Sequence, residues 1–239
     1  MAGDPSHPLL SVVIPCFNEQ ARLPPTVDAI EKYLSDRGIG HELILADDGS
    51  SDGTSRAIDE AAARAPVVKV TLPRNRGKGR ALAEGVAVSR GDRVLLTDAD
   101  LSTPIDELPK LMAAVDSGAG VAIGSRAIRG SRVVVSQPVY RVLMGKTFNL
   151  MVQVVLLPGI WDTQCGFKLF RGDLARDVFS ALATDGFGYD PEALYRAKRR
   201  GERIAEVPVV WRNSAPTKVA ALRHSLGMIR DLVKIRLGR

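Results

Sequence analysis

The first half of the chain alternates apolar runs of strand length with segments of helical length, and this alternation restricts the fold more than any other feature. It continues without interruption to residue 124. The predicted strands are Leu9–Ile14, Glu42–Ala46, Val67–Thr71, Arg93–Thr97 and Gly120–Gly124. The predicted helices are Pro24–Asp36, a segment capped by Asp52 that ends at Ala63, Gly79–Ser89 and Ile105–Asp116. Such alternation predicts an α/β fold with a Rossmann-like, mostly parallel central sheet and helices on both faces.

The second half of the chain has a less regular pattern. Helices are predicted at Val139–Leu157, Pro191–Arg200 and Val219–Leu237, and a short strand at Phe167–Phe170. A further strand, Ile204–Trp211, contains Pro208 and is therefore expected at the edge of a sheet. A chain of 239 residues suits one α/β domain. We expect this domain to span residues 1–218, with residues 219–239 forming a basic amphipathic helix rather than a second domain.

The acidic pair Asp98-Ala99-Asp100 directly follows the predicted strand that ends at Thr97. Ligands bind at the carboxyl ends of the strands in open α/β sheets. Carboxylates two residues apart can share one hard divalent cation, Mg²⁺ or Mn²⁺, with a phosphate. Acidic residues also follow strands in ordinary solvated turns, so the pair alone is a weak signal. A second acidic strand end, Asp47-Asp48, lies upstream, and together the two predict a nucleotide–metal site.

Three further segments at predicted strand ends each have two interpretations. Asp47–Thr54 has the composition of a turn followed by a helix cap. Asp47 itself belongs to the strand end, however, where a buried carboxylate needs a hydrogen-bond donor such as a base or a ribose. Asn75–Gly79 is either a basic loop near a diphosphate, with Lys78 as the contact, or a glycine-rich helix entry. Arg126 follows a strand and is either an ordinary surface residue or, as we favour, a phosphate clamp.

The charge is unevenly distributed along the chain. From Arg212 onward the sequence has seven Lys or Arg and one acidic residue, so this segment carries the whole net charge of +6. No acidic residue occurs between Asp116 and Asp162, a stretch that contains five Lys or Arg. Two basic zones on an otherwise neutral protein predict an anionic partner. The zones lack interleaved aromatic residues, which argues against nucleic acid and favours phosphate groups or an anionic membrane surface.

Targeting signals are not evident in the sequence. The N-terminal residues lack a basic region followed by an apolar core, so no signal peptide is predicted. Cys16 and Cys165 have no metal-ligand spacing and are expected to be reduced thiols. We expect a cytoplasmic protein that is peripherally associated with the cytoplasmic face of a membrane.

The motifs together resemble a known enzyme family, the inverting family 2 glycosyltransferases with the GT-A fold. The motifs that carry this resemblance are Val13–Glu19, Asp47–Thr54, Asn75–Gly79 and Asp98–Ser102. Four further motifs resemble one branch of this family, the polyprenyl-phosphate branch, which contains the dolichyl-phosphate β-glucosyltransferases and the related mannose synthases. These motifs are Gly124–Arg126, Asp162–Lys168, Asp190–Glu192 and Glu206–Pro208. Ser102 and Ser214 stand where the mannose synthase pattern has Gln and Arg, which favours glucose as the sugar.

The resemblance implies roles for particular residues. Asp98, Asp100 and Arg126 would be catalytic, with Asp100 as the main metal ligand and Asp98 beside it. The residues expected to bind the nucleotide sugar, UDP-glucose in the favoured case, are Pro15, Asn18, Glu19, Asp47, Lys78, Asp98 and Arg126. The residues expected to bind the polyprenyl phosphate acceptor are Arg129, Arg141, Lys168 and Lys218.

Three hypotheses about function remain open from the sequence. The first is a metal-dependent inverting transfer of a sugar to a polyprenyl phosphate, whose anionic oxygen needs no strong base. The second is transfer to a hydroxyl of a soluble or polysaccharide acceptor, which requires a general base. The candidates for that base are Asp162, Asp185 and Asp190. The third is a catalytically silent, membrane-surface binding protein that keeps the fold.

Overall fold

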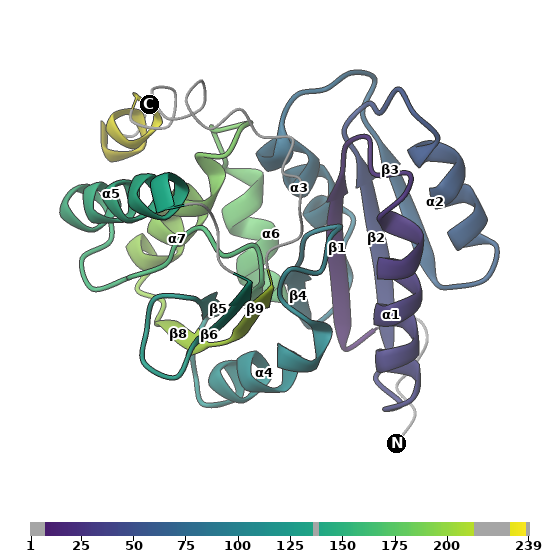
Figure 1. Ribbon diagram of the computed structural model, residues 1–239, viewed down its shortest axis with the longest axis horizontal. Helices are drawn as coiled ribbons and strands as arrows, with labels where there is room; N and C mark the ends of the chain where they lie inside the picture. Colours follow the sequence, from purple (N-terminus) through teal and green to yellow (C-terminus); the bar gives the residue numbers. More distant parts are fainter. Residues whose placement is uncertain (1–7, 136–138, 213–229, 238–239) are drawn as a thin grey trace.

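A seven-stranded sheet forms the centre of the protein (Figure 1). The computed structural model describes residues 8–135, 139–212 and 230–237. The strands of the main sheet, in chain order, are β1 (Leu10–Cys16), β2 (His41–Asp47), β3 (Val67–Thr71), β4 (Arg93–Leu96), β5 (Val121–Ser125), β7 (Lys168–Arg171) and β8 (Ile204–Pro208). In space their order is β3-β2-β1-β4-β7-β5-β8. A separate two-stranded sheet pairs β6 (Arg132–Val135) with β9 (Val210–Arg212).

All strands of the main sheet except β7 point in the same direction. β1 pairs in parallel with β2 and β4, β2 with β3, and β5 with β8, whereas β7 is antiparallel to both β4 and β5. The predicted mostly parallel sheet is therefore confirmed. The carboxyl ends of the parallel strands and the beginning of β7 consequently meet at one edge of the sheet.

Helices cover both faces of the sheet, as the alternation predicts. Their bounds are α1 (Leu23–Ser35), α2 (Thr54–Ala62), α3 (Lys78–Ala87), η1 (Ile105–Glu107), α4 (Leu108–Asp116), α5 (Val139–Val155), α6 (Gly172–Ser180) and α7 (Tyr189–Arg199). Helices α1, α2 and α4 pack on one face, and α3, α5, α6 and α7 on the other. Within β1, Val12 and Ile14 belong to the first apolar cluster and Val13 to the second. Burial on both faces explains the continuous apolar run Val12–Ile14 in this strand.

The second half differs from the prediction in three places. Helix α6 was not expected, although Leu174, Ala175, Val178 and Phe179 recur on one helical face and are buried. Strand β6 was also not expected, because its residues are exposed. The segment predicted as one strand, Ile204–Trp211, is divided into β8 and β9 after Pro208. The predicted edge position is confirmed, since β8 is an outer strand of the main sheet.

The C-terminal helix is described only for residues 230–237. Leu232 and Ile235 are buried in the cluster beneath α5 and α7, whereas Val233 and Leu237 are more than half exposed. Residues 219–229 of the predicted helix, and with them Lys218, lie outside the described residues. Among the helices that the structure describes, none has the length and hydropathy needed to cross a bilayer.

A buried hydrogen-bond network ties the strands together at the opposite edge of the sheet. The Glu42 carboxylate at the start of β2 accepts hydrogen bonds from Ser11 Oγ (2.6 Å) and from the backbone N–H of Arg90 (2.7 Å). Ser11 Oγ in turn accepts the N–H of Gly91, just before β4 (2.8 Å). One carboxylate thus links β1, β2 and the entry to β4.

We predict that Glu42→Ala lowers the free energy of unfolding by about 2–3 kcal/mol, because it leaves buried donors without an acceptor. Chemical denaturation monitored by circular dichroism measures this change. The control is Glu60→Ala, which removes an exposed carboxylate that pairs with Arg56 and should change stability by less than about 0.5 kcal/mol. Equal effects of the two substitutions would contradict the role assigned to Glu42.

Candidate active site

The polar strand ends predicted from the sequence meet at one edge of the sheet. Cys16 at the end of β1 is paired with Asp47 at the end of β2, and Asp98 follows β4 on the other side of β1. Lys168, the first residue of β7, lies between Leu96 of β4 and Ile123 of β5. The strand order reverses between β1 and β4, and open α/β sheets bind ligands at such a position.

Asp98 lies in close contact with Lys78, the first residue of α3. Its Oδ1 accepts a hydrogen bond from Lys78 Nζ at 2.6 Å, and its Oδ2 lies against Gly166, where a Cβ would collide with it. Burial by itself would raise the pKa of Asp98, but the positive charges of Lys78, Lys168 and Arg126 outweigh it and hold the pKa below its ordinary value. Burial likewise opposes the charge of Lys78, yet Asp98 keeps the pKa of Lys78 well above its usual range. Both groups are therefore ionised at neutral pH.

The loop before α3 is shaped to deliver Lys78 to this position. The buried Asp48 carboxylate accepts the backbone N–H groups of Arg76 (2.7 Å) and Gly77 (2.8 Å). Gly77 has φ +109°, which an L side chain rarely adopts. A Cβ on Gly79 would approach the backbone oxygen of Thr184 to 2.5 Å. The glycine-rich helix entry is thus present, whereas the contact of Lys78 with a diphosphate stays a prediction, because its partner in the structure is Asp98.

Arg126 is oriented by a carboxylate that the sequence offered as a candidate base. Its Nε and Nη2 donate to the two oxygens of buried Asp162 at 2.7 and 2.8 Å, and its backbone N–H donates to the same carboxylate at 2.9 Å. Glu206 of β8 accepts the N–H groups of Trp161 (2.8 Å) and Asp162 (3.0 Å) and so fixes the loop that carries Asp162. Burial would raise the pKa of Asp162, but Arg126 and Lys168 lower it overall. Asp162 is therefore an ionised partner of Arg126.

Lys168 and Asp190 form a buried ion pair below the strand ends. Lys168 Nζ also donates to the backbone oxygen of Cys165 at 2.5 Å. The ring of Tyr189, which is buried, lies 5.6 Å from Lys78 Nζ and 5.9 Å from Lys168 Nζ. Both lysines thus lie near one aromatic ring. The expected contact of Lys168 with an acceptor stays a prediction, since in the structure its partners belong to the protein itself.

The residues expected to bind the nucleotide gather at the ends of β1 and β2. Buried Asp47 accepts the N–H of Ser50 at 2.9 Å, which supplies the donor that this strand end needed. Asn18 has a positive φ of 56°, and its Oδ1 accepts the N–H of Ser51 at 2.9 Å. Glu19 is paired with Arg22 at 2.6 Å. Pro15 is adjacent to Ala46 in the sheet register. Their contact with a nucleotide stays a prediction.

The residues expected to bind the acceptor are not brought together by the described part of the chain. Arg129 is exposed in the turn after β5. Arg141 belongs to α5, but its side chain lies outside the described residues, as does Lys218. The sequence analysis included Asp48 in the second acidic strand end and Glu206 in a motif, but it gave neither residue a role of its own, and it did not single out Tyr189.

The acidic pair fits a hard divalent cation that is shared with a ligand. Asp100 Oδ1 accepts the N–H of Ser102 at 3.0 Å, which orients this carboxylate, and Asp98 is kept ionised by its neighbours. In the chain segments that the structure describes, no cluster of three or more His, Cys, Asp or Glu side chains could hold a metal ion. Mg²⁺ typically binds one or two carboxylates together with substrate phosphates and water, so Asp98 and Asp100 are a sufficient protein contribution.

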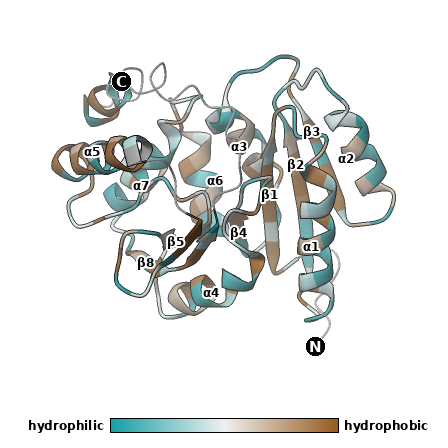
Figure 2. Ribbon diagram, viewed as in Figure 1, coloured by the Kyte–Doolittle hydropathy of each residue, from teal (hydrophilic) through white to brown (hydrophobic). Residues whose placement is uncertain are grey.

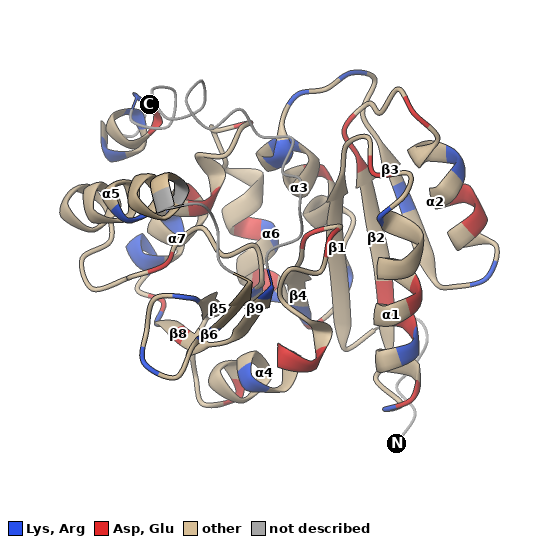
Figure 3. Ribbon diagram, in the orientation of Figure 1, with Lys and Arg blue, Asp and Glu red and all other residues tan. Residues whose placement is uncertain are grey.

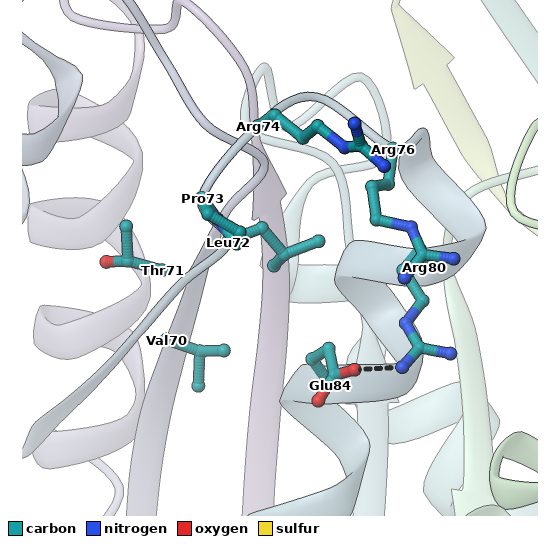
Figure 4. A pocket seen from close by; sticks show the side chains of 8 residues that line it. All are labelled: Val70, Thr71, Leu72, Pro73, Arg74, Arg76, Arg80 and Glu84. Atoms are coloured by element: carbon teal, nitrogen blue, oxygen red, sulfur yellow. Dashed lines mark ion pairs between the residues drawn. The ribbon is translucent and has the colours of Figure 1, made fainter.

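A groove of about 490 Å³ lies beside the loop after β3 (Figure 4). Arg74, Arg76 and Arg80 line it together with Glu84. Arg80 pairs with Glu84 at 2.5 Å, and Arg76 pairs with Asp185 at 2.8 Å. Neither carboxylate of the acidic pair lines this groove. The site is therefore assigned from the strand-end residues and not from this groove.

The fold and the site define the class of protein. The family model of glycosyl transferase family 2 matches residues 11–179, more than half of the chain. The chain thus belongs to glycosyl transferase family 2 and is a glycosyltransferase, as the resemblance implied.

Curated relatives make the comparison more specific. The dolichyl-phosphate β-glucosyltransferase of Homo sapiens is 36% identical over 242 residues, covering 95% of this chain and 75% of the relative. The enzyme of the same name from Dictyostelium discoideum is 34% identical over 240 residues, covering 95% and 73%. Among solved structures, glucosyl-3-phosphoglycerate synthase from Mycobacterium tuberculosis superposes with a TM-score of 0.73 at 21% identity, covering 96% of this chain and 80% of that chain. This likeness confirms the GT-A fold.

We predict that Asp162→Asn lowers the free energy of unfolding at pH 7 by about 2–4 kcal/mol, because it leaves Arg126 without its buried counter-charge. The lowered pKa of Asp162 means that the wild-type contribution is complete above the unfolded pKa and is lost as the pH falls through the folded value. Below about pH 4 the stability of Asp162→Asn should thus fall less steeply than that of the wild type. Urea denaturation between pH 2 and 7 measures both curves, and parallel curves would contradict the assignment.

We predict that Asp100→Asn reduces metal-dependent turnover on the order of 100-fold or more, because the substitution removes an anionic ligand of a Lewis-acidic ion. Asp100 is only partly buried, and an asparagine oxygen can still accept the N–H of Ser102, so the free energy of unfolding should change by less than about 0.5 kcal/mol. Initial rates at graded Mg²⁺ and Mn²⁺ concentrations provide the measurement. Wild-type rates at every metal concentration would exclude Asp100 as a ligand.

Proposed function

We propose that this glycosyltransferase transfers glucose, with inversion, from UDP-glucose to a polyprenyl phosphate in the presence of Mg²⁺ or Mn²⁺. The names of the curated relatives support a lipid-phosphate acceptor and a glucosyl product. The Mycobacterium tuberculosis enzyme with the same fold was crystallised with Mn²⁺ and UDP-glucose, which supports the donor and the metal. Asp98 and Asp100, which follow β4, are suited to hold a divalent cation together with the diphosphate of such a donor, and this supports the same choice of donor and metal.

The observation that carries the choice of acceptor is the pairing of the candidate bases. Asp162 is paired with Arg126, Asp185 with Arg76, and Asp190 with Lys168. A hydroxyl acceptor must lose a proton to a base, and a carboxylate engaged with a cation is a poor proton acceptor. A phosphate acceptor is already an anion at neutral pH and needs no such base. The ion pairs therefore favour a phosphate over a hydroxyl.

The residues of the site have distinct tasks in this reaction. Asp98 and Asp100 would hold a divalent cation, which supplies Lewis acidity to the leaving diphosphate. Arg126, fixed by Asp162, and Lys78 lie where negative charge develops as the bond from the anomeric carbon to the diphosphate breaks. An acceptor phosphate oxygen forms the new bond from the opposite face, and UDP departs.

The nucleoside and the acceptor are assigned to different sets of residues. Asp47, Asn18, Glu19 and Pro15 are placed for the nucleoside, at the ends of β1 and β2. Arg129, Arg141, Lys168 and Lys218 are proposed for the lipid phosphate. A lipid acceptor requires contact with a membrane, so we also propose peripheral attachment to the cytoplasmic face and to its anionic surface. The silent alternative is disfavoured, because the site retains Asp98, Asp100 and an oriented Arg126.

A matrix of donors and acceptors tests the proposal. We expect radiolabel transfer from UDP-glucose to polyprenyl phosphate at least about 100-fold faster than to a hydroxyl of 3-phosphoglycerate or of an oligosaccharide, because only the phosphate nucleophile is already ionised and needs no base. Asp98→Asn serves as the inactive control. Preferential transfer to a hydroxyl would establish the alternative, and no transfer or donor hydrolysis with any pair would establish a silent protein.

The pH dependence provides a separate test of the acceptor chemistry. If the phosphate is the nucleophile, the acidic limb of kcat/KM follows the second ionisation of the acceptor, at about pH 6 for a phosphate monoester. A phosphonate analogue, whose second ionisation lies higher, should move this limb to higher pH. A limb that stays in place with the analogue would indicate an enzymatic base instead.

A further inference from the structure

A second groove, of about 370 Å³, opens where α5 and α7 end beside the helix of residues 230–237. One part of its lining is apolar and consists of Val154, Val155, Leu156 and Pro158. The other part consists of Tyr195, Lys198, Arg199 and Arg236. Asp190 is the second residue of α7, whereas Tyr195, Lys198 and Arg199 follow it by 5, 8 and 9 residues, roughly 8–14 Å along the helix, and neither Lys168 nor Asp190 lines the groove. The groove is therefore separate from the site at the strand ends.

The groove concentrates positive charge without a compensating carboxylate. Lys198 Nζ is 3.5 Å from the backbone oxygen of Pro158, and Arg236 Nη1 donates to Tyr195 Oη at 3.0 Å. Within the described segments, no ion pair connects Lys198, Arg199 or Arg236 to an acidic residue. The end of the α7 dipole accounts for Lys198 and Arg199 but not for Arg236, which comes from another helix. Three cations around one hollow favour an anion.

An exposed apolar stripe leads along α5 into this groove. Tyr140, Leu143, Leu150 and Val154 recur on one side of the helix, and each is more than half exposed. Val154, which is 79% exposed, belongs to both the stripe and the groove lining. Figure 2 shows apolar colouring on α5, and Figure 3 shows no acidic colouring on it. An apolar helix face bordered by basic residues is typical of helices that lie in a membrane interface.

We propose that the groove binds the phosphate headgroup of an anionic phospholipid while the apolar stripe of α5 rests on the bilayer. Guanidinium groups bind phosphate oxygens in a bidentate manner, and Val154 and Pro158 offer apolar contact to the adjoining part of the lipid. A soluble anion would gain nothing from the apolar half of the lining or from the exposed stripe. This inference rests on the proposed function, because a lipid acceptor is what requires the protein to lie on a bilayer. The bilayer that holds the acceptor then lies along α5.

Vesicle sedimentation tests the groove directly. The variant combines Lys198→Gln, Arg199→Gln and Arg236→Gln, which keeps much of each side chain but removes three charges. On vesicles of phosphatidylcholine mixed with phosphatidylglycerol, we expect its partition coefficient to fall on the order of 100-fold relative to the wild type. The matched control combines Lys32→Gln, Arg56→Gln and Arg64→Gln, three cations on α1, α2 and the turn after α2, and should bind as the wild type does.

The apolar contribution requires its own variant. Leu150→Asp combined with Val154→Asp should weaken binding to the mixed vesicles at least about tenfold, because charged residues are disfavoured in the apolar layer. Circular dichroism and thermal melts verify that all variants fold. Unchanged binding of either the triple or the double variant would overturn the proposal. Displacement of the wild type from vesicles by millimolar inorganic phosphate would also overturn it and indicate a soluble-anion site.

Turnover in detergent separates this inference from the proposed function. The triple variant should transfer sugar to detergent-solubilised polyprenyl phosphate at the wild-type rate, because the groove is separate from the strand-end site. A proportional loss of turnover and vesicle binding would assign the groove to the active site and refute a separate headgroup site. If the wild type binds vesicles through the groove but does not use polyprenyl phosphate, the proposed function fails and the groove assignment stands.

Discussion

The site depends on the pairing of carboxylates with cations at a single edge of the sheet. Burial alone would raise the pKa values of Asp98 and Asp162 and so disfavour their ionisation in the absence of counter-charges. Lys78, Arg126 and Lys168 provide these charges, each from a different segment of the chain. The start of α3, the residue after β5 and the start of β7 must therefore converge. Only then can Asp98 and Asp162 be ionised in this buried position. This requirement connects the order of the strands to the chemistry of the site.

The antiparallel strand β7 makes this convergence possible. Because β7 runs against β4 and β5, its first residue rather than its last lies at the ligand-binding edge. The loop of residues 161–167 thereby reaches the same edge and delivers Asp162 to Arg126. Glu206 of the parallel edge strand β8 holds that loop through two backbone N–H groups. A parallel β7 would place Lys168 at the far end of the sheet, and Arg126 would lack its partner.

The sequence predicted the first half of the fold well because local patterns and global topology agree there. The buried strands β1, β2 and β4 each contain a continuous apolar run, and each crossover helix has the period of a half-buried helix. The direction of β7 could not be predicted, since a strand of four residues carries no local signal of its orientation. The division of Ile204–Trp211 was also hidden, although Pro208 marked the point where one strand ends. Helix α6 was detectable from the spacing of Leu174, Ala175, Val178 and Phe179.

Within the site, sequence identified the acidic strand ends but not the partners that define their roles. Asp162 was a candidate base on the sequence, and only its two contacts with Arg126 distinguish an orienting carboxylate from a proton acceptor. Buried ion pairs are often no more stabilising than apolar residues of similar volume, because desolvation offsets their attraction. Their concentration at the ligand-binding edge is therefore better explained by orientation than by stability. Fixed charges of this kind stabilise a developing charge without reorganising during the reaction, which is what the departure of a diphosphate requires.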